Sequence, residues 1–137
     1  MAVLAVNLPV RRVLAVAVIA VMVCGACDRT GDNRDLRQAV QTFVSAVQRH
    51  DGPGVCGALA PDAAESLESG GKQCAAQVTG LDLGSGAITG VQVWGERAQA
   101  HLSDDTVFLA RFPGGWKVTA AGCEPQPKGP YDCEVEA

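Results

Sequence analysis

The chain has few of the residues on which metal, hydrolytic or nucleic-acid chemistry depends. It has two histidines in 137 residues, no CxxC motif beyond residue 27, and no histidine at ligand spacing from a cysteine, which argues against zinc. Its serines lack a GxSxG context, which argues against a serine nucleophile. Basic residues are also scarce, with 11 Lys and Arg against 15 Asp and Glu. We therefore expect no metal or other cofactor, no catalytic residues and no nucleic-acid partner.

An apolar run too short to span a membrane lies near the start of the chain. Residues 13–23 form an uncharged run of 11 residues, whereas a membrane-spanning helix needs about 20. Arg11 and Arg12 precede this run, and the small residues Gly25 and Ala26 follow it. This order is typical of a secretory signal that is cleaved after Ala26.

The next residue is the candidate site of lipid attachment. A small residue directly before Cys27 resembles the bacterial lipobox, in which the cysteine receives diacylglycerol and becomes the first residue of the mature protein. Cys24 departs from that pattern, which usually has Leu, Val or Ile there. The alternatives are ordinary signal-peptidase cleavage after Ala26 and retention of the segment as an anchor. The residues before Arg11 are unusual for a signal, so a translation start near Val10 is a further alternative.

Cysteine parity and charge both favour lipidation. Beyond residue 26 the chain has five cysteines, and an odd cysteine in an oxidising compartment needs a separate fate. Without Arg11 and Arg12 the chain has 9 basic and 15 acidic residues, a net charge of −6, which disfavours electrostatic adhesion to anionic lipid. We expect attachment to the extracytoplasmic face of the cell membrane through acyl chains on Cys27, or otherwise secretion. The predicted organisation is a lipoprotein-type signal peptide (residues 1–26), a polar tether (27–33) and one α+β domain (34–137).

The first half of that domain has helical periodicity. Apolar residues recur at helical spacing after Asn33, which predicts a helix to about His50 with Asp32 or Asn33 as its cap. Gly52 and Pro53 are expected to end it. Shorter helical pieces are predicted over residues 55–59, 61–67 and 73–78.

The second half changes to a period of two after the glycines at 80, 84 and 86. Short connectors between the apolar segments predict hairpins and hence an antiparallel meander. Trp116, Val118 and Ala120 are expected to share one apolar face with alternate residues of the first two strands. The fold class is therefore α+β, with N-terminal helices packed on a four-stranded sheet. The predicted strands are Ile88 to Trp94, Arg97 to Ser103, Thr106 to Phe112 and Trp116 to Cys123.

The third predicted strand is apolar on both faces. Val107 and Leu109 lie on one face, and Phe108, Ala110 and Phe112 lie on the other. Such a strand is usually covered on both sides. The helices are expected to cover the first face. The second is a candidate contact surface for another copy, a partner protein or the C-terminal tail, and cover by the domain's own loops is the alternative.

Four cysteines remain for disulfides, and four cysteines allow three connectivities. We favour Cys56–Cys74, because that bond would tie two short helices together, and Cys123–Cys133, because that bond would close a proline-rich extended loop. The loop-entropy model gives each bond roughly 3 kcal/mol.

The order of elements resembles a known fold. The segment AVQTFVSAVQRHDGPGVCGAL and the ending GGWKVTAAGCEPQPKGPYDCEVE are similar to the nuclear transport factor 2-like (NTF2-like, cystatin-like α+β cone) domains of small actinobacterial lipoproteins. This resemblance implies a curved sheet with helices across its concave face, often with dimerisation through the sheet. It implies no chemistry, because the fold carries enzymes, carriers and adaptors.

Three classes of function remain open. Enzymes of this fold commonly place an Asp and a His inside the cone, but Asp51 and His50 are adjacent on a helix end and point in different directions. His101 is expected on the polar face of its strand, and Arg111 is a candidate anion clamp or a solvated edge residue. The interpretation we favour is a non-catalytic envelope interaction module that uses the third strand and Trp94. The alternative is a carrier of small apolar ligands in an interior made roomy by alanines at 98, 100, 110 and 120.

Overall fold

The long helix at the start of the domain is present, and it begins earlier than predicted. The computed structural model describes residues 31–137, so the predicted signal, Cys27 and its lipidation lie outside the described residues. Residues 31–48 are helical. Asp32 and Asn33 are therefore inside the helix and do not cap it, and the helix includes the last residues of the predicted tether. No described helix is both long and apolar enough to cross a bilayer.

The end of this helix is built on a left-handed residue. His50 has φ 53°, and it is the non-glycine residue with positive φ among those described. Its N–H donates to the carbonyl of Val47 at 3.0 Å, and the N–H of Asp51 donates to the carbonyl of Ala46 at 2.9 Å. These are the two hydrogen bonds of a Schellman motif, which satisfy carbonyls left open at a helix end. The motif ends the helix before Gly52 is reached.

Gly52 and Pro53 begin a helix. The prediction that these two residues end the preceding helix was therefore wrong, because the Schellman motif ends it. Helix α2 is Gly52–Ala58, and Asp51 caps it by accepting a hydrogen bond from the Gly54 N–H at 3.0 Å. Proline in the first turn of a helix loses no hydrogen bond, because the N–H there has no helical partner. Pro61 begins α3 in the same way, as predicted. The remaining helical elements are α3 (Pro61–Ser66), the 3₁₀ turn η1 (Ser69–Gly71) and α4 (Cys74–Val78).

The second half is an antiparallel sheet of five strands in the order β1-β2-β3-β4-β5. The α+β class and the four predicted strands are confirmed, and the fifth strand was missed. β5 pairs with the end of β4, so the last residues of the proline-rich tail are a strand. The strands are β1 (Ile88–Trp94), β2 (Arg97–Leu102), β3 (Thr106–Phe112), β4 (Gly115–Glu124) and β5 (Asp132–Glu136).

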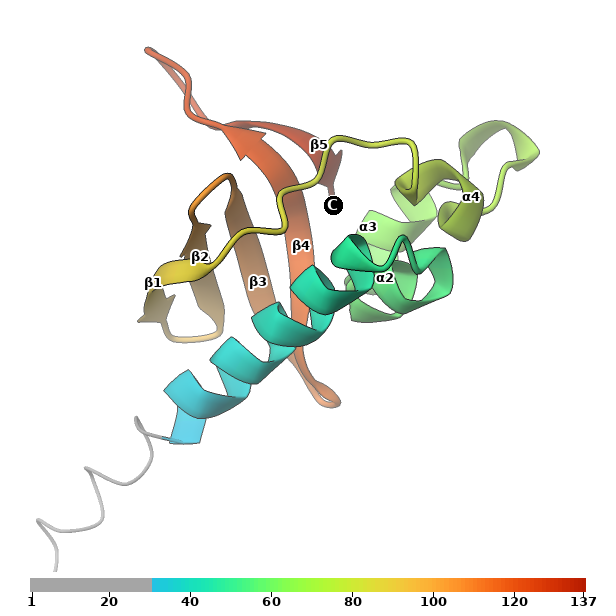
Figure 1. Ribbon diagram of the computed structural model, residues 1–137. Helices are drawn as coiled ribbons and strands as arrows, with labels where there is room; N and C mark the ends of the chain where they lie inside the picture. The colour runs from blue at the N-terminus through green and yellow to red at the C-terminus, as the bar shows by residue number, and fades with distance from the viewer. Residues whose placement is uncertain (1–30) are drawn as a thin grey trace, which may run out of the picture. The chain divides into compact units, whose positions relative to one another are not determined.

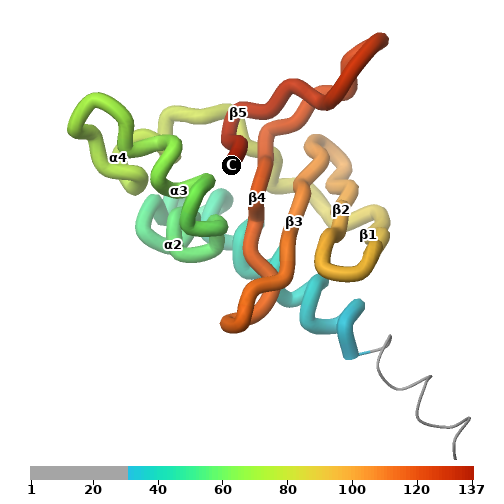
Figure 2. The backbone as a smooth tube through the Cα atoms, turned by 180° about the vertical axis from the view of Figure 1, so that it is seen from behind, coloured from blue at the N-terminus to red at the C-terminus, as the bar shows by residue number. Residues whose placement is uncertain are grey.

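The helix of residues 31–48 crosses one face of the sheet, here called the inner face (Figure 1). The opposite face, called the outer face, is turned toward the viewer in Figure 2 and carries no described helix over β1, β2 or β3. Phe43 from the helix and Val107 and Leu109 from β3 are at most 1% exposed within one core. Asn33–Ala137 form a single compact unit around this core.

A β-bulge in β4 changes which alanine faces the core. Leu109 pairs with Val118, but Phe108 pairs with Ala120, so β4 has one extra residue, Thr119, between the two pairs. Directly paired residues point to the same side of a sheet, so Ala120 lies on the outer face with Phe108. The prediction that Ala120 joins Trp116 and Val118 was wrong. Ala121 takes the inner position and is fully buried in the core.

Two adjacent aspartates hold the connector between the helices and the sheet. The carboxylate of Asp105 accepts hydrogen bonds from the N–H groups of Gly84, Thr106, Gly122 and Cys123 at 2.6 to 3.1 Å. Asp104 accepts two more from the N–H groups of residues 85 and 86. A side chain at Gly84 would overlap Asp105. Three of these six hydrogen bonds go to residues 84, 85 and 86, so they fix the glycine-rich connector against the sheet.

The favoured disulfide connectivity is confirmed. Cys56 is bonded to Cys74, which joins α2 to α4, and Cys123 is bonded to Cys133, which joins β4 to β5. The second bond connects residues that are also direct partners in the sheet, with Cα atoms 4.0 Å apart. It therefore fixes the start of β5 as well as closing the loop.

Candidate functional site

The outer face of the sheet contains a groove of about 570 Å³. It lies along β3 and β4, and the C-terminal segment forms one of its sides. Phe108, Ala110 and Phe112, the residues predicted to form the second apolar face of β3, all line it. The predicted second apolar face of β3 is therefore part of a concave, largely apolar feature. The other lining residues are Ala60, Asp62, Arg97, Thr119, Ala120, Pro130, Tyr131, Glu136 and Ala137.

Aromatic residues are concentrated on this face. The chain has six aromatic residues: three Phe, two Trp and one Tyr. Phe43 and Trp116 are buried in the core, whereas the other four lie on or beside the outer face, where Phe112 lines the groove and also packs against the edge of the core. Trp94 belongs to this group because it pairs with Arg97, which pairs with Ala110 in the groove. A core would gain most from these large side chains, so the position of Trp94, Phe108 and Tyr131 outside the core favours a role in contact with another molecule. The four are Trp94, Phe108, Phe112 and Tyr131.

The C-terminal tail covers part of the groove. The ring of Tyr131 packs edge-on against Phe108, with ring centroids 5.1 Å apart and planes at 72°. The Tyr131 hydroxyl accepts a long hydrogen bond of 3.4 Å from the side-chain amide of Gln99. The tail was one of the predicted covers of this face, and it covers Phe108. Ala110 and Phe112 still line the open groove.

Trp94 is the last residue of β1, next to the β1–β2 turn, and it pairs with Arg97, which lines the groove. It is 58% exposed and is the exposed large hydrophobic residue among those described. Arg97, directly opposite it in the sheet, is also exposed. Tryptophan and arginine are the residue types that most often dominate the free energy of binding at protein interfaces. The groove and Trp94 therefore form a continuous candidate surface.

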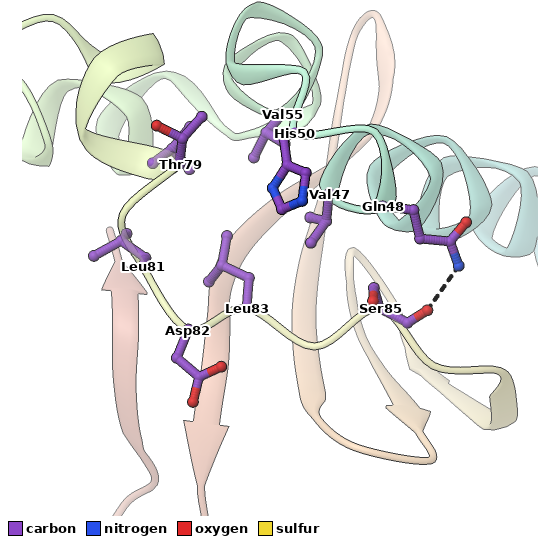
Figure 3. Close-up of a pocket in the computed structure, with 10 residues that line it drawn as sticks. Val47, Gln48, His50, Val55, Thr79, Leu81, Asp82, Leu83 and Ser85 are labelled. Carbon is purple, nitrogen blue, oxygen red and sulfur yellow. Dashed lines mark hydrogen bonds between the residues drawn. The ribbon is translucent and has the colours of Figure 1, made fainter.

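A second hollow, of about 370 Å³, lies where the long helix, α2, α4 and the connector meet (Figure 3). Val47, Val55 and Leu83 contribute apolar side chains to it, and His50 points toward it. The carboxylate of Asp82 points away from His50 in this view. The hollow therefore holds no visible pairing of an acid with a base.

The residues considered for catalysis have structural explanations in the described part of the chain. Asp51 caps α2, and one of its carboxylate oxygens lies 3.6 Å from a guanidinium nitrogen of Arg49. These two contacts hold the carboxylate, so it is not positioned to act on a substrate together with His50. His101 lies on β2, where it pairs with Gly90 and Thr106, whereas His50 lies at the end of the long helix and lines the second hollow. These positions give no convergent acid and base for proton transfer.

Arg111 does not project freely as an anion clamp. Its guanidinium lies 4.7 Å from the ring centroid of Trp116, and its Nε lies 3.5 Å from a carboxylate oxygen of Glu96. The cation–π contact and the ion pair together fix the side chain at the β1–β2 end of the sheet. Arg111 therefore differs from Arg97, which is exposed beside the groove.

The space between the long helix and the sheet is occupied by side chains. Leu36, Val40 and Phe43 meet Val107 and Leu109 there, and each of these residues is at most 1% exposed. Ala98 and Ala100 also face this core, whereas Ala110 and Ala120 line the outer groove. Beside this packed core, a recess remains between the long helix and the start of β1, with Gln41, Val44 and Ile88 among the residues that line it.

A third hollow is lined by many carboxylates, including Asp82 and Glu134. Asp104 and Asp105 also line it, but their oxygens accept the backbone hydrogen bonds described above. No group of three or more His, Cys, Asp or Glu in residues 31–137 has an arrangement that could hold a metal ion.

Sequence reasoning identified Trp94 and the second face of β3 but missed the rest of the groove. Tyr131 was assigned to a loop, and Arg97 and Glu136 were given no role. The signal that was available is the alternation of Tyr131, Cys133 and Val135 after the prolines, which is the period of a strand. Comparison with family models, with curated proteins and with solved structures finds no match.

Proposed function

We propose that the protein is a cell-envelope lipoprotein whose domain is a non-catalytic interaction module, and that the outer face binds a partner protein of the envelope. The observation that carries the proposal is the aromatic groove: of the six aromatic residues of the chain, three line the groove and a fourth, Trp94, lies beside it on the same face. Protein interfaces are enriched in such residues at their buried centre.

The disulfides support the extracytoplasmic part of this proposal. Bonds such as Cys56–Cys74 and Cys123–Cys133 persist in oxidising compartments and are rare in the cytosol. Because both bonds use cysteines of the domain, Cys27 keeps no partner within the described chain, and diacylglycerol attachment gives it a role. The five-stranded sheet with helices on one face also supports the NTF2-like cone as the fold family.

Lipid attachment is tested by the intact mass of the protein purified from its native membrane in detergent. We expect the chain to begin at Cys27 and to carry the added mass of its acyl groups. The Cys27→Ser variant should lack that mass and appear in the soluble fraction. An unmodified wild-type chain beginning at Cys27 would refute the anchor and leave simple secretion.

Partner binding is tested by site-specific photo-crosslinking in the native envelope. A photoreactive phenylalanine analogue replaces Phe112 in the groove, and the same analogue replaces Gln41, an exposed residue of the long helix, as the control. We expect one discrete crosslinked protein from position 112 and none from position 41. The crosslink should disappear when Trp94→Ala is added. Equal crosslinking from both positions, or none from position 112, would contradict the proposed role of the groove.

An enzyme or an interior carrier receives less support from these features. Buried side chains fill the core between the long helix and the sheet, and no described acid and base converge. The groove, by contrast, is open, apolar and bordered by charge. Interaction with a protein uses each of these properties.

A further inference from the structure

The groove on the outer face is electrically polarised from one side to the other. Arg97 lines its β2 side, whereas Asp62 and Glu136 line the side formed by α3 and β5. All three side chains belong to exposed residues. Apolar side chains of β3 and β4 lie between the two sides. The groove therefore has a cation on one side, carboxylates on the opposite side and apolar side chains between them.

The separation of these charges follows from the sheet register. Glu136 pairs with Ala120, which pairs with Phe108, which pairs with Gln99, two residues along β2 from Arg97. Neighbouring strands are about 4.8 Å apart and successive residues about 3.3 Å apart, so three strand spacings and two residue steps place the Cα atoms of Arg97 and Glu136 about 16 Å apart. An extended chain covers that distance in about five residues.

We propose that the groove binds an extended protein segment with a basic residue and an acidic residue about five positions apart and apolar residues between them. The acidic group lies against Arg97, the basic group lies against Glu136 and Asp62, and the apolar residues contact Phe108 and Phe112. This inference rests on the proposed function, and it specifies the chemistry of the partner. Complementary charges at the rim fix the register of the bound segment, and the apolar centre provides most of the contact.

The arrangement of the groove favours a protein segment over a single apolar molecule. An acyl chain would use the aromatic residues and leave the charges at both ends without partners. A segment with the stated pattern matches the apolar centre and both charged ends. Tyr131 and Pro130 form one side of the groove, so a bound segment would also contact the C-terminal tail.

The test uses the full chain and three fluorescently labelled, blocked hexapeptides, with binding measured by fluorescence anisotropy. The dipolar peptide has the order lysine, leucine, proline, phenylalanine, leucine, glutamate. The acidic peptide replaces its lysine by glutamate, and the basic peptide replaces its glutamate by lysine. We expect the wild type to bind the dipolar peptide most tightly, and each of the other two about fivefold more weakly, which is the upper range for one exposed ion pair.

Charge reversals in the protein should exchange this preference. Arg97→Glu should favour the basic peptide, and Glu136→Lys should favour the acidic peptide. The matched controls Arg37→Glu and Glu68→Lys make the same charge changes at exposed positions that do not line the groove, and they should keep the wild-type order. Circular dichroism of each variant checks that the fold is retained.

Two outcomes would overturn the inference. Equal affinity of the wild type for all three peptides would remove the role of the charges. No measurable binding of the dipolar peptide at millimolar concentration would remove the segment itself. Crosslinking from position 112 is independent of both results, so the proposed function can stand when this inference fails.

Discussion

The two faces of the sheet differ in the kind of apolar residue that they carry and in what covers them. The inner face has aliphatic side chains such as Val107 and Leu109, which are at most 1% exposed beneath the long helix. The outer face has the aromatic side chains Phe108 and Phe112, which are half-buried around an open groove. Both sets come from one strand and alternate along it. This difference fits the proposed function, in which β3 contributes to stability on one side and to recognition on the other.

The largest expected effect is a difference between neighbouring positions of β3. Leu109→Ala should lower the free energy of unfolding by about 3 kcal/mol, because it leaves a cavity in a closed core. Phe112→Ala should lower it by less than about 1 kcal/mol, because the ring already borders solvent. Urea denaturation of the full chain measures both values. Equal losses would mean that the outer face is structural, and the functional comparison between the faces would fail.

The sequence predicted the two faces of β3 because strand alternation is a local property. The period of two alone places Val107 and Leu109 on one face of the strand and Phe108 on the other, without any knowledge of the neighbouring strands. It did not predict that Ala120 faces outward. That position depends on a bulge at Thr119, and the bulge depends on pairing with β3 and β5 together. Periodicity cannot reveal an extra residue that has the same apolar character as its neighbours.

Removal of each disulfide in turn should also have different effects on the two faces of the sheet. Removing Cys56–Cys74 or Cys123–Cys133 by paired Cys→Ser changes should cost about 3 kcal/mol in either case by the loop-entropy model. Only loss of the second bond should alter the groove, because Tyr131 lies inside the loop that this bond closes. Nuclear Overhauser contacts between Tyr131 and Phe108 measure that effect. Their loss in the Cys56/Cys74 double variant instead would show that the helices hold the tail.

The disulfide pairing was predictable, but the strand after it was not. Cys123 and Cys133 are close in sequence and enclose prolines, so a closed loop was the natural expectation. β5 is short and mostly acidic, and it forms because β4 extends beyond its pairing with β3 and offers a free edge. Such an edge is a property of the assembled sheet. The Asp62 and Glu136 side of the groove was missed for the same reason.

A smaller effect is expected where the connector meets the sheet, away from both faces. Asp105→Asn should lower the free energy of unfolding by about 2 kcal/mol, because an amide nitrogen cannot accept the hydrogen bonds that one carboxylate oxygen now accepts. Asp104→Asn should cost about half as much, because Asp104 is exposed and accepts two N–H groups. Amide exchange at Gly122 and Cys123 should accelerate in the first variant alone. Equal acceleration in both would mean that the two aspartates act as one unit.

The aspartate pair was read from sequence as a hairpin connector, which it is, but its second role is a tertiary one. Asp105 reaches Gly84 and Gly122, which are 21 and 17 residues away in the chain. The sequence contains both glycines, and at Gly84 the lack of a side chain allows the close approach of Asp105. Nothing local connects them to an aspartate at that distance. The sequence therefore shows the aspartates and the glycines, but it does not show that they contact each other.

The smallest expected effect is a gain in stability at the end of the long helix. His50→Gly should raise the free energy of unfolding by about 0.5 to 1 kcal/mol, because glycine adopts the left-handed conformation without the cost of a Cβ but orders with a larger loss of entropy. His50→Ala should bring no such gain, since alanine meets the same steric penalty. Thermal unfolding of the three proteins measures the order. Peptide binding by the outer groove should be unchanged in His50→Gly, because this residue lies on the helix side of the sheet and its substitution should alter stability alone. A parallel change in groove affinity would show that the two faces are coupled through the sheet.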